Sequence, residues 1–281
     1  MKRKICFPIL LIAMLGIALV FGIAMGANEA YGLETYNPTA INYGSYTCDG
    51  FVDEYYAEAV AIAPLSNRTA LGGDRINDAR FRQGTIGFNA LENVQGGRAG
   101  VVTANHIAND YRNMYHGWAG ALSPTIGRIS MRAPNADAAF APFNNNWTAT
   151  PYANSNNPFR IRMGRPEHIT VNNQTKQIGA ATAALRTGLM QVVNFDLQNW
   201  FGYRVRQVFR TTASGGSGDS GGPVFYVSGD THYLIGMILG GSDDGRRTYA
   251  ISIFEVVRLL NVTVYCIDIH NLLLNYIPTL M

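Results

Sequence analysis

Short apolar runs separated by turn residues are the feature that most restricts how this chain of 281 residues can fold. From Gly72 onward such runs alternate with turns that contain Gly and Asn. They lie at 85–88, 100–103, 138–140, 189–195, 203–210, 223–227, 233–239 and 248–253. Short strands at regular spacing are typical of all-β barrels and sandwiches. The clearest amphipathic helix is at 254–260, so we predict an all-β domain closed by a C-terminal helix.

The segment 216–224, GSGDSGGPV, places a serine in a glycine-rich turn. A serine hydroxyl is a weak nucleophile unless a base accepts its proton and donors hold the oxyanion that forms. Turn glycines let backbone N–H groups point inward, so we predict that the Gly218 and Ser220 amides are such donors. A flexible loop is the alternative, but loops need glycine without this order of Asp, Ser and Pro.

A serine nucleophile needs a base and an acid that orients it. Among five histidines, His106 alone follows a buried run (101–104) into a turn, which would hold its imidazole rigidly. Asp137 precedes a small apolar run that would bury its carboxylate behind His106. Asp110 and Asp196 are the alternatives, and both have the context of loop or surface charges.

The N-terminus has the pattern of an export signal. Met1–Lys4 is basic, 5–25 is apolar, and Ala24-Met25-Gly26 is a small-x-small cleavage pattern. The apolar run of 21 residues is also long enough to span a bilayer, so an uncleaved anchor is the alternative. Either way the remaining chain lies outside the cytosol, and we expect a secreted protein.

Four glycosylation sequons agree with export, although each is a weak signal by itself. They begin at Asn67, Asn146, Asn173 and Asn261. Outside the leader, which contains Cys6, the only cysteines are Cys48 and Cys266. They form one disulfide or remain two isolated thiols.

Charge and composition exclude some partners. A net charge of +3 and 15% charged residues do not favour nucleic acid or an anionic membrane. The cysteines and histidines form no ligand-spaced cluster, so we predict no metal and no other cofactor. We expect a monomer that contacts a membrane only if its leader stays as an anchor.

The order His106, Asp137, Ser220 resembles that of the chymotrypsin-like serine proteases, as do the flanks Thr103-Ala104-x-His106 and 218–223. The streptogrisins and alpha-lytic protease are the more similar branch. The similarity to that branch lies in 71–74 with 86–89, in 210–214, and in 235–242.

The resemblance covers about 71–262 and implies two packed six-stranded antiparallel β-barrels with the triad between them. It also implies a pro-segment, which matches the acidic, Tyr-rich stretch before the strands. The expected segments are a leader (1–26), a pro-segment (27–70), an N-terminal barrel (71–175), a C-terminal barrel with its helix (176–262) and an apolar tail (263–281).

This chain departs from the family at its disulfides. The family bridges a cysteine after the catalytic histidine to an earlier strand, and here Ile107 and Gly84 occupy those positions. A second family bridge corresponds to Ser214 and the region 242–245. Both partners of each bridge are absent, which would cost about 2–5 kcal/mol per bridge without compensation. Asn105 is a further departure, because small residues are usual there.

Asp219 needs a partner if it is buried beside the oxyanion donors. The bacterial-type branch uses an internal arginine, so the resemblance suggests Arg186 as the cation. An ordinary exposed arginine is the alternative.

The substrate pocket is expected between Ser214 and the segment Ile238, Leu239, Gly240 and Gly241. The stretch 211–217 has no acid, and apolar Ile238 and Leu239 favour a large apolar P1 side chain. The Gly241 backbone would pair with the substrate strand. Asp243 and Asp244 leave a basic P1 residue as the alternative.

These features together predict a serine endopeptidase that cleaves polypeptides through an acyl-enzyme. A catalytically silent binding protein on the same scaffold is one alternative, since fold alone does not determine function. Self-cleavage near residue 70 as the sole activity is another.

Overall fold

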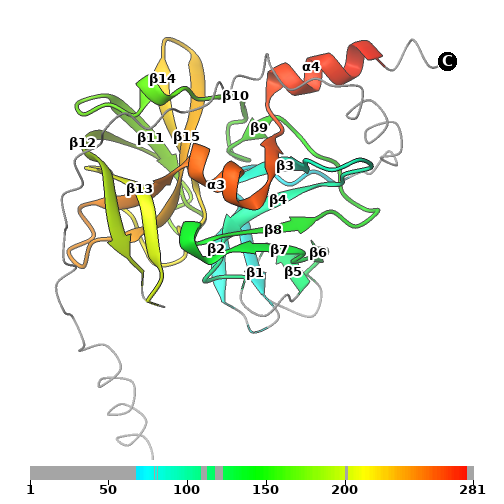
Figure 1. The fold of residues 1–281 in the computed structure, drawn as a ribbon, viewed down its shortest axis with the longest axis horizontal. Coiled ribbons are helices and arrows are strands. Elements are labelled where there is room, and N and C mark those ends of the chain that lie inside the picture. Colours follow the sequence, from blue (N-terminus) through cyan, green and yellow to red (C-terminus); the bar gives the residue numbers. More distant parts are fainter. Residues whose placement is uncertain are drawn as a thin grey trace, which may run out of the picture. The chain divides into compact units, whose positions relative to one another are not determined.

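The computed structural model describes residues 68–78, 80, 82–108, 113–117, 123–199 and 202–276, with side chains to residue 272. The leader, most of the expected pro-segment, Asn67 and Cys48 lie outside these residues. Strands dominate the described chain, and Figure 1 shows them in two groups.

The first group of strands consists of two antiparallel sheets. One sheet has the order β17 (Val262–Val264), β3 (Phe88–Glu92), β4 (Ala99–Ala104), β8 (Ala138–Pro142), β7 (Met131–Ala133). The other has the order β2 (Gln83–Thr85), β1 (Arg75–Asp78), β5 (Asn113–His116), β6 (Thr125–Arg128). Contacts of β2 with β4 and of β6 with β8 close the two sheets around one apolar core.

The second group is a closed ring of six antiparallel strands. Its order is β14 (Pro223–Ser228), β11 (Gln174–Ile178), β12 (Leu185–Gln198), β13 (Arg204–Thr211), β16 (Thr248–Ser252), β15 (Thr231–Gly241). Pairing of β14 with β15 completes the ring, which leaves it no open edge. The predicted all-β fold of two barrels is confirmed.

Two α-helices and two short 3₁₀ turns accompany the barrels in the described part of the chain. The predicted C-terminal helix is α3 (Ile253–Leu260), and it contacts β15 and β16 of the second barrel and β7, β8 and β17 of the first. A further helix, α4 (Ile267–Tyr276), contacts β10. The 3₁₀ turns are η1 (Pro134–Ala136) and η2 (Pro166–His168). Among the described helices, none is long and apolar enough to cross a membrane.

The sheet topology moves the expected boundary between the barrels. β9 (Tyr152–Ala153) and β10 (Phe159–Met163) precede residue 176, yet they belong to the sheet of the second barrel. The reason is a long-range parallel pairing of β10 with β15, which local sequence patterns do not reveal. The expected tail likewise begins within β17, whose partner is β3 of the first barrel.

The folded domain also begins before the expected boundary at residue 70. Thr69 forms a β-bridge with Thr148, and Ala70 is fully buried. The Asn89 side-chain amide donates to the Ala70 carbonyl oxygen at 2.8 Å. Residues 68–70 are therefore part of the packed structure.

A buried histidine lies at the start of β15. His232 is 9% exposed, and its ring stacks on Phe159 at a centroid distance of 3.9 Å. Burial, with a smaller effect of Lys176, holds the pKa of His232 below its ordinary value of 6.5 despite the opposing effect of Asp230. The neutral imidazole is the form that this barrel accommodates.

We expect His232 to make the fold acid-sensitive. Since its pKa is lower in the folded chain, the unfolded chain binds the proton first as pH falls, and unfolding is favoured. The stability it supports is complete above about pH 7 and is lost progressively below about pH 6.5. His232→Phe keeps the stacking and cannot be protonated. Its Tm should fall less than that of the parent chain between about pH 7.5 and about pH 5. Equal falls would contradict this role.

Candidate active site

His106 is fixed at the end of a buried strand. β4 carries residues 99–104, and the chain then makes one tight turn in which the Ile107 and Ala108 amides donate to the Ala104 and Asn105 carbonyls. The Thr103 hydroxyl donates to the Thr85 carbonyl at 2.7 Å and ties the strand to its neighbour β2. The imidazole is therefore presented from rigid backbone.

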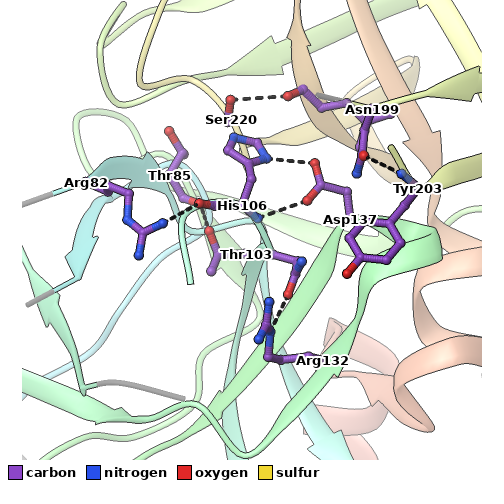
Figure 2. Close-up of polar contacts among 11 residues, drawn as sticks. Arg82, Thr85, Thr103, His106, Arg132, Asp137, Asn199, Tyr203 and Ser220 are labelled. Carbon is purple, nitrogen blue, oxygen red and sulfur yellow. Dashed lines mark hydrogen bonds and ion pairs between the residues drawn. The ribbon is translucent and has the colours of Figure 1, made fainter. Parts of the chain in front are cut away.

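Asp137 reaches His106 because of the register between two strands. β4 and β8 pair with Ala104 opposite Ala138, so the residue before β8 meets the turn after β4. The Asp137 carboxylate accepts from the His106 amide at 2.9 Å and contacts His106 Nδ1 at 2.7 Å (Figure 2). Asp137 is 1% exposed and has a left-handed φ of 44° at the end of η1. A buried carboxylate at Nδ1 holds the proton there and leaves Nε2 as the acceptor.

Ser220 is presented by the nucleophile turn, which we define as residues 213–222. Its carbonyl accepts from the Thr85 amide at 2.8 Å, and its hydroxyl donates to the Leu239 carbonyl at 3.2 Å. In Figure 2 the His106 ring is drawn between the Ser220 hydroxyl and the Asp137 carboxylate. A Cβ placed on Gly221 would lie 2.5 Å from Thr103 Oγ1, so the turn packs directly against the end of β4. The structure thus brings all three predicted residues into one region.

Within residues 218–222 of the nucleophile turn, two amides are available to a ligand. The amides of Asp219, Gly221 and Gly222 donate to the carbonyls of Gly216, Ile238 and Asp219, respectively. Within the described chain, the amides of Gly218 and Ser220 have no acceptor. Gly218 has a φ of +96°, a conformation that L side chains rarely adopt, and this fixes the direction of the turn. These are the two amides expected from the sequence.

Asp219 is held by backbone amides instead of by Arg186. Its carboxylate is 1% exposed and accepts from the amides of Gly216 at 2.8 Å and of Ala181 and Thr182 at 3.1 Å each. A Cβ on Gly179 would lie 2.0 Å from Asp219 Cγ, so this loop approaches only as glycine. Three N–H donors satisfy a buried carboxylate without a cation.

The predicted ion pair between Asp219 and Arg186 is therefore wrong. The Arg186 guanidinium instead contacts the Ser214 hydroxyl and, at 3.5 Å, the Ser214 carbonyl. Arg186 lies opposite Gln177 in the pairing of β11 with β12, which places its side chain under Ser214 and away from Asp219.

Asn105 has a role that the sequence indicated only as a departure from the usual small residue. Its side-chain oxygen accepts from Arg132 Nε at 2.6 Å, and its amide donates to the Asp137 carbonyl at 2.8 Å. Asn105 is 2% exposed. Arg132, on β7, was not predicted, because nothing in the local sequence indicates that β7 lies beside the histidine turn.

The expected apolar pocket wall is absent. Ile238 and Leu239 are 1% and 2% exposed and pack in the apolar core. A β-bulge between Ile238 and Gly240 changes which faces the residues of β15 present, and alternation along the strand does not predict such a bulge. Of the other residues expected to line the pocket, Ser214 is part of the nucleophile turn, Gly241 lies beside that turn, and Gly240 precedes Gly241 on β15.

The underside of Ser214 is bound to the second barrel by a buried polar network. Gln177 Nε2 donates to the Ser214 carbonyl at 3.1 Å and to Thr248 Oγ1 at 2.8 Å. Thr248 in turn donates to the Ala213 carbonyl at 2.9 Å. At the positions of the other missing bridge, a Cβ on Gly84 would lie 2.7 Å from Ile107 Cγ1, so the isoleucine packs against the glycine.

The other predicted sites have the following positions. Asn146 and Asn261 are exposed, whereas Asn173 is half-buried and its Nδ2 donates to the His168 carbonyl at 3.0 Å. Cys266 is buried between β17 and α4, and because Cys48 is outside the described residues their disulfide stays a prediction. In the described parts, no group of three or more His, Cys, Asp or Glu is placed to hold a metal ion.

No family model and no curated protein matches the chain. Solved structures do. Thermobifida fusca Protease A has a TM-score of 0.57 at 23% identity, covering 71% of this chain and 100% of its own. Nocardiopsis protease has a TM-score of 0.56 at 23% identity, and the match covers 70% of this chain and 99% of that protein. Cellulomonas bogoriensis chymotrypsin has a TM-score of 0.55 at 21% identity, and the match covers 71% of this chain and 100% of that protein. The chain has the fold of the bacterial chymotrypsin-like serine proteases. The resemblance recognised in the sequence is confirmed at the level of this chymotrypsin-like fold.

We expect Asp219 and Arg186 to act independently on stability. Asp219→Asn directs an amide N–H at backbone donors and should lower the free energy of unfolding by about 2–3 kcal/mol. Arg186→Met should cost about 1 kcal/mol. Denaturant unfolding of both variants and of the double variant checks additivity to within about 0.5 kcal/mol. A coupling energy above about 1 kcal/mol between the two substitutions would contradict this and support an ion pair between Asp219 and Arg186.

Removing Arg132 should destabilise the chain. Arg132→Ala leaves the buried Asn105 oxygen without its donor, at a cost of about 1–3 kcal/mol in the free energy of unfolding. Arg98→Ala is the matched control, because Arg98 is 59% exposed and its pair with Glu92 lies on the surface. The control should cost less than about 1 kcal/mol. Equal losses in the two variants would argue against the buried contact.

Proposed function

We propose that this chain is a secreted serine endopeptidase that hydrolyses polypeptides through an acyl-enzyme. The observation that carries the proposal is the alignment of Ser220, His106 and Asp137 beside two unused amides. Any one of these features occurs in ordinary structural proteins. Their combination on a chymotrypsin-like fold supports acyl transfer, because that chemistry needs a nucleophile, a base with an orienting acid, and donors for the oxyanion.

In the proposed reaction, His106 Nε2 accepts the Ser220 proton as Oγ attacks the scissile carbonyl carbon. The Asp137 carboxylate stabilises the imidazolium that forms and keeps the ring oriented. The Gly218 and Ser220 amides donate to the carbonyl oxygen as it becomes an oxyanion. The C–N bond then breaks, and His106 returns its proton to the leaving amine.

Deacylation repeats these steps with water. His106 accepts a proton from the water molecule, whose oxygen attacks the ester carbonyl. The C–O bond to Ser220 breaks and Oγ recovers the proton. The site needs no metal or organic cofactor for this sequence of proton transfers.

Export, a pro-segment and a monomeric state belong to the same proposal and rest on the sequence. Cleavage between residues 70 and 71 is not part of it, because Ala70 is fully buried and its carbonyl is bonded to Asn89.

A fluorophosphonate probe tests the nucleophile directly. The secreted parent chain should be labelled, Ser220→Ala should not be labelled, and His106→Ala should be labelled about 10⁴-fold or more slowly. Ser130→Ala, at an exposed serine outside the site, is the control and should be labelled like the parent. Peptide mapping should place the adduct on Ser220.

Proteolysis requires a second measurement on the same samples. Digestion of an unfolded protein substrate, followed by mass spectrometry, should give internal fragments with the parent and none with Ser220→Ala. Absence of Ser220-dependent labelling would favour the silent binding protein. Labelling without fragments would contradict an endopeptidase.

A further inference from the structure

The strand β15 has an open edge beside Ser220. On one side β15 pairs with β14 only as far as Met237, and the Ile238 amide and carbonyl then bond to Gly222 and Gly221. On the other side its pairing with β16 continues to Gly241. In the described structure, the edge of Leu239–Gly241 that faces the nucleophile turn has no partner strand. An extended peptide added there would pass Ser220.

The side chain of the residue before the scissile bond would enter between two backbone segments. One is Leu239–Gly241, and the other is the part of the nucleophile turn at 213–216. A Cβ placed on Gly241 would lie 3.5 Å from the Gly215 carbonyl oxygen and 3.7 Å from its carbon. A Cβ on Gly245 would lie 3.9 Å from the same oxygen. The two segments are therefore close together even though both are built from glycine.

The separation is too small for a large side chain. A Cα–Cβ bond is about 1.5 Å long, so Gly241 Cα is at most about 5 Å from the Gly215 oxygen. A group held between two walls needs a contact of about 3.5–4 Å on each face, or about 7–8 Å in all. An aromatic ring or a leucine side chain therefore cannot pass between Gly241 and Gly215 unless the two segments move apart.

Hydrogen bonds hold the walls in place. Gln177 binds the Ser214 carbonyl and Thr248, and Thr248 binds the Ala213 carbonyl, so the turn at 213–215 is attached to β11 and β16. Gln177 and Thr248 are 2% and 0% exposed. Separating the walls would break buried hydrogen bonds, which are costly to leave unmade.

Of the two acids that could select a basic side chain here, Asp243 is exposed and Asp244 is hydrogen-bonded within its own turn. The Asp244 carboxylate accepts from the Ser242 hydroxyl at 2.6 Å and from the Arg246 amide at 3.0 Å. It is thus engaged in its own exposed turn.

We propose that the slot between Gly215 and Gly241 restricts this chain to substrates with a small P1 residue, namely Gly, Ala or Ser. The inference rests on the proposed function and replaces the large apolar P1 residue expected from the sequence. The determinants are the backbone approach of Gly215 to Gly241 and the Gln177 network that maintains it.

A series of chromogenic peptides that differ only at P1 tests the slot. With Gly, Ala, Val, Leu, Phe, Lys and Glu at P1, kcat/KM should be highest for Ala or Gly. It should be about 10–100-fold lower for Leu and Phe. Gly241→Ala adds a methyl group at ordinary contact distance, so the variant should fold. It should cleave the Ala peptide about tenfold less well than the Gly peptide.

The fluorophosphonate probe separates the two levels of the proposal. Labelling of the parent chain reports the reactivity of Ser220 alone, because the small probe does not require the slot. Gly96→Ala is the control for loss of a glycine, since Gly96 has no atom within 4 Å and its φ is +67°. It should keep the parent's P1 profile.

If the parent chain is labelled by the fluorophosphonate probe but cleaves peptides with Leu, Phe, Lys or Glu at P1 best, the proposed restriction to small P1 residues is wrong. The proposed function is then unaffected. Failure of the parent chain to be labelled would overturn both.

Discussion

The buried carboxylate of Asp219, with its three amide donors, is the interaction on which the candidate active site depends. Its two oxygens accept hydrogen bonds from the amide of Gly216 within the nucleophile turn and from the amides of Ala181 and Thr182 in the loop that follows β11. A buried anion with three directed donors has one low-energy position, and the turn is built around it. Since Gly218 and Ser220 are its immediate neighbours, this position also sets the direction of their amides.

Two kinds of contact occupy the places where the family has disulfides. Beside the histidine, Ile107 packs against Gly84. Beneath the nucleophile turn, Gln177 connects Ser214 to Thr248. A disulfide acts largely by restricting the unfolded chain, whereas these contacts act only in the folded one. Such a site keeps its shape without an oxidising environment, but it is more sensitive to any loss of packing around it.

Much of the fold and the candidate site was predictable because the informative residues are close in sequence. Short bounded runs indicate strands, and the surroundings of Ser220 and His106 are local patterns. Asp137 was selected because it precedes a small apolar run. That run is β8, and its pairing with β4 brings Asp137 to the turn that carries His106.

The errors concern contacts that join distant segments. The choice between Arg186 and backbone amides for Asp219 depends on how the loop after β11 folds back. The burial of Ile238 and Leu239 depends on a bulge, and the start of the second barrel depends on a parallel pairing across about 70 residues of chain. Local periodicity contains none of this information.

Thr85 links the two barrels at the nucleophile. Its hydroxyl donates to the Gly218 carbonyl and accepts from the Ala180 amide, both at 2.8 Å, and its own amide donates to the Ser220 carbonyl. One residue of β2 in the first barrel thereby contacts the serine and both loops that surround it in the second. Any sliding of one barrel on the other must displace the serine from the imidazole. The docking of the barrels and the geometry of the candidate site thus depend on the same hydrogen bonds of Thr85, and neither can change without the other.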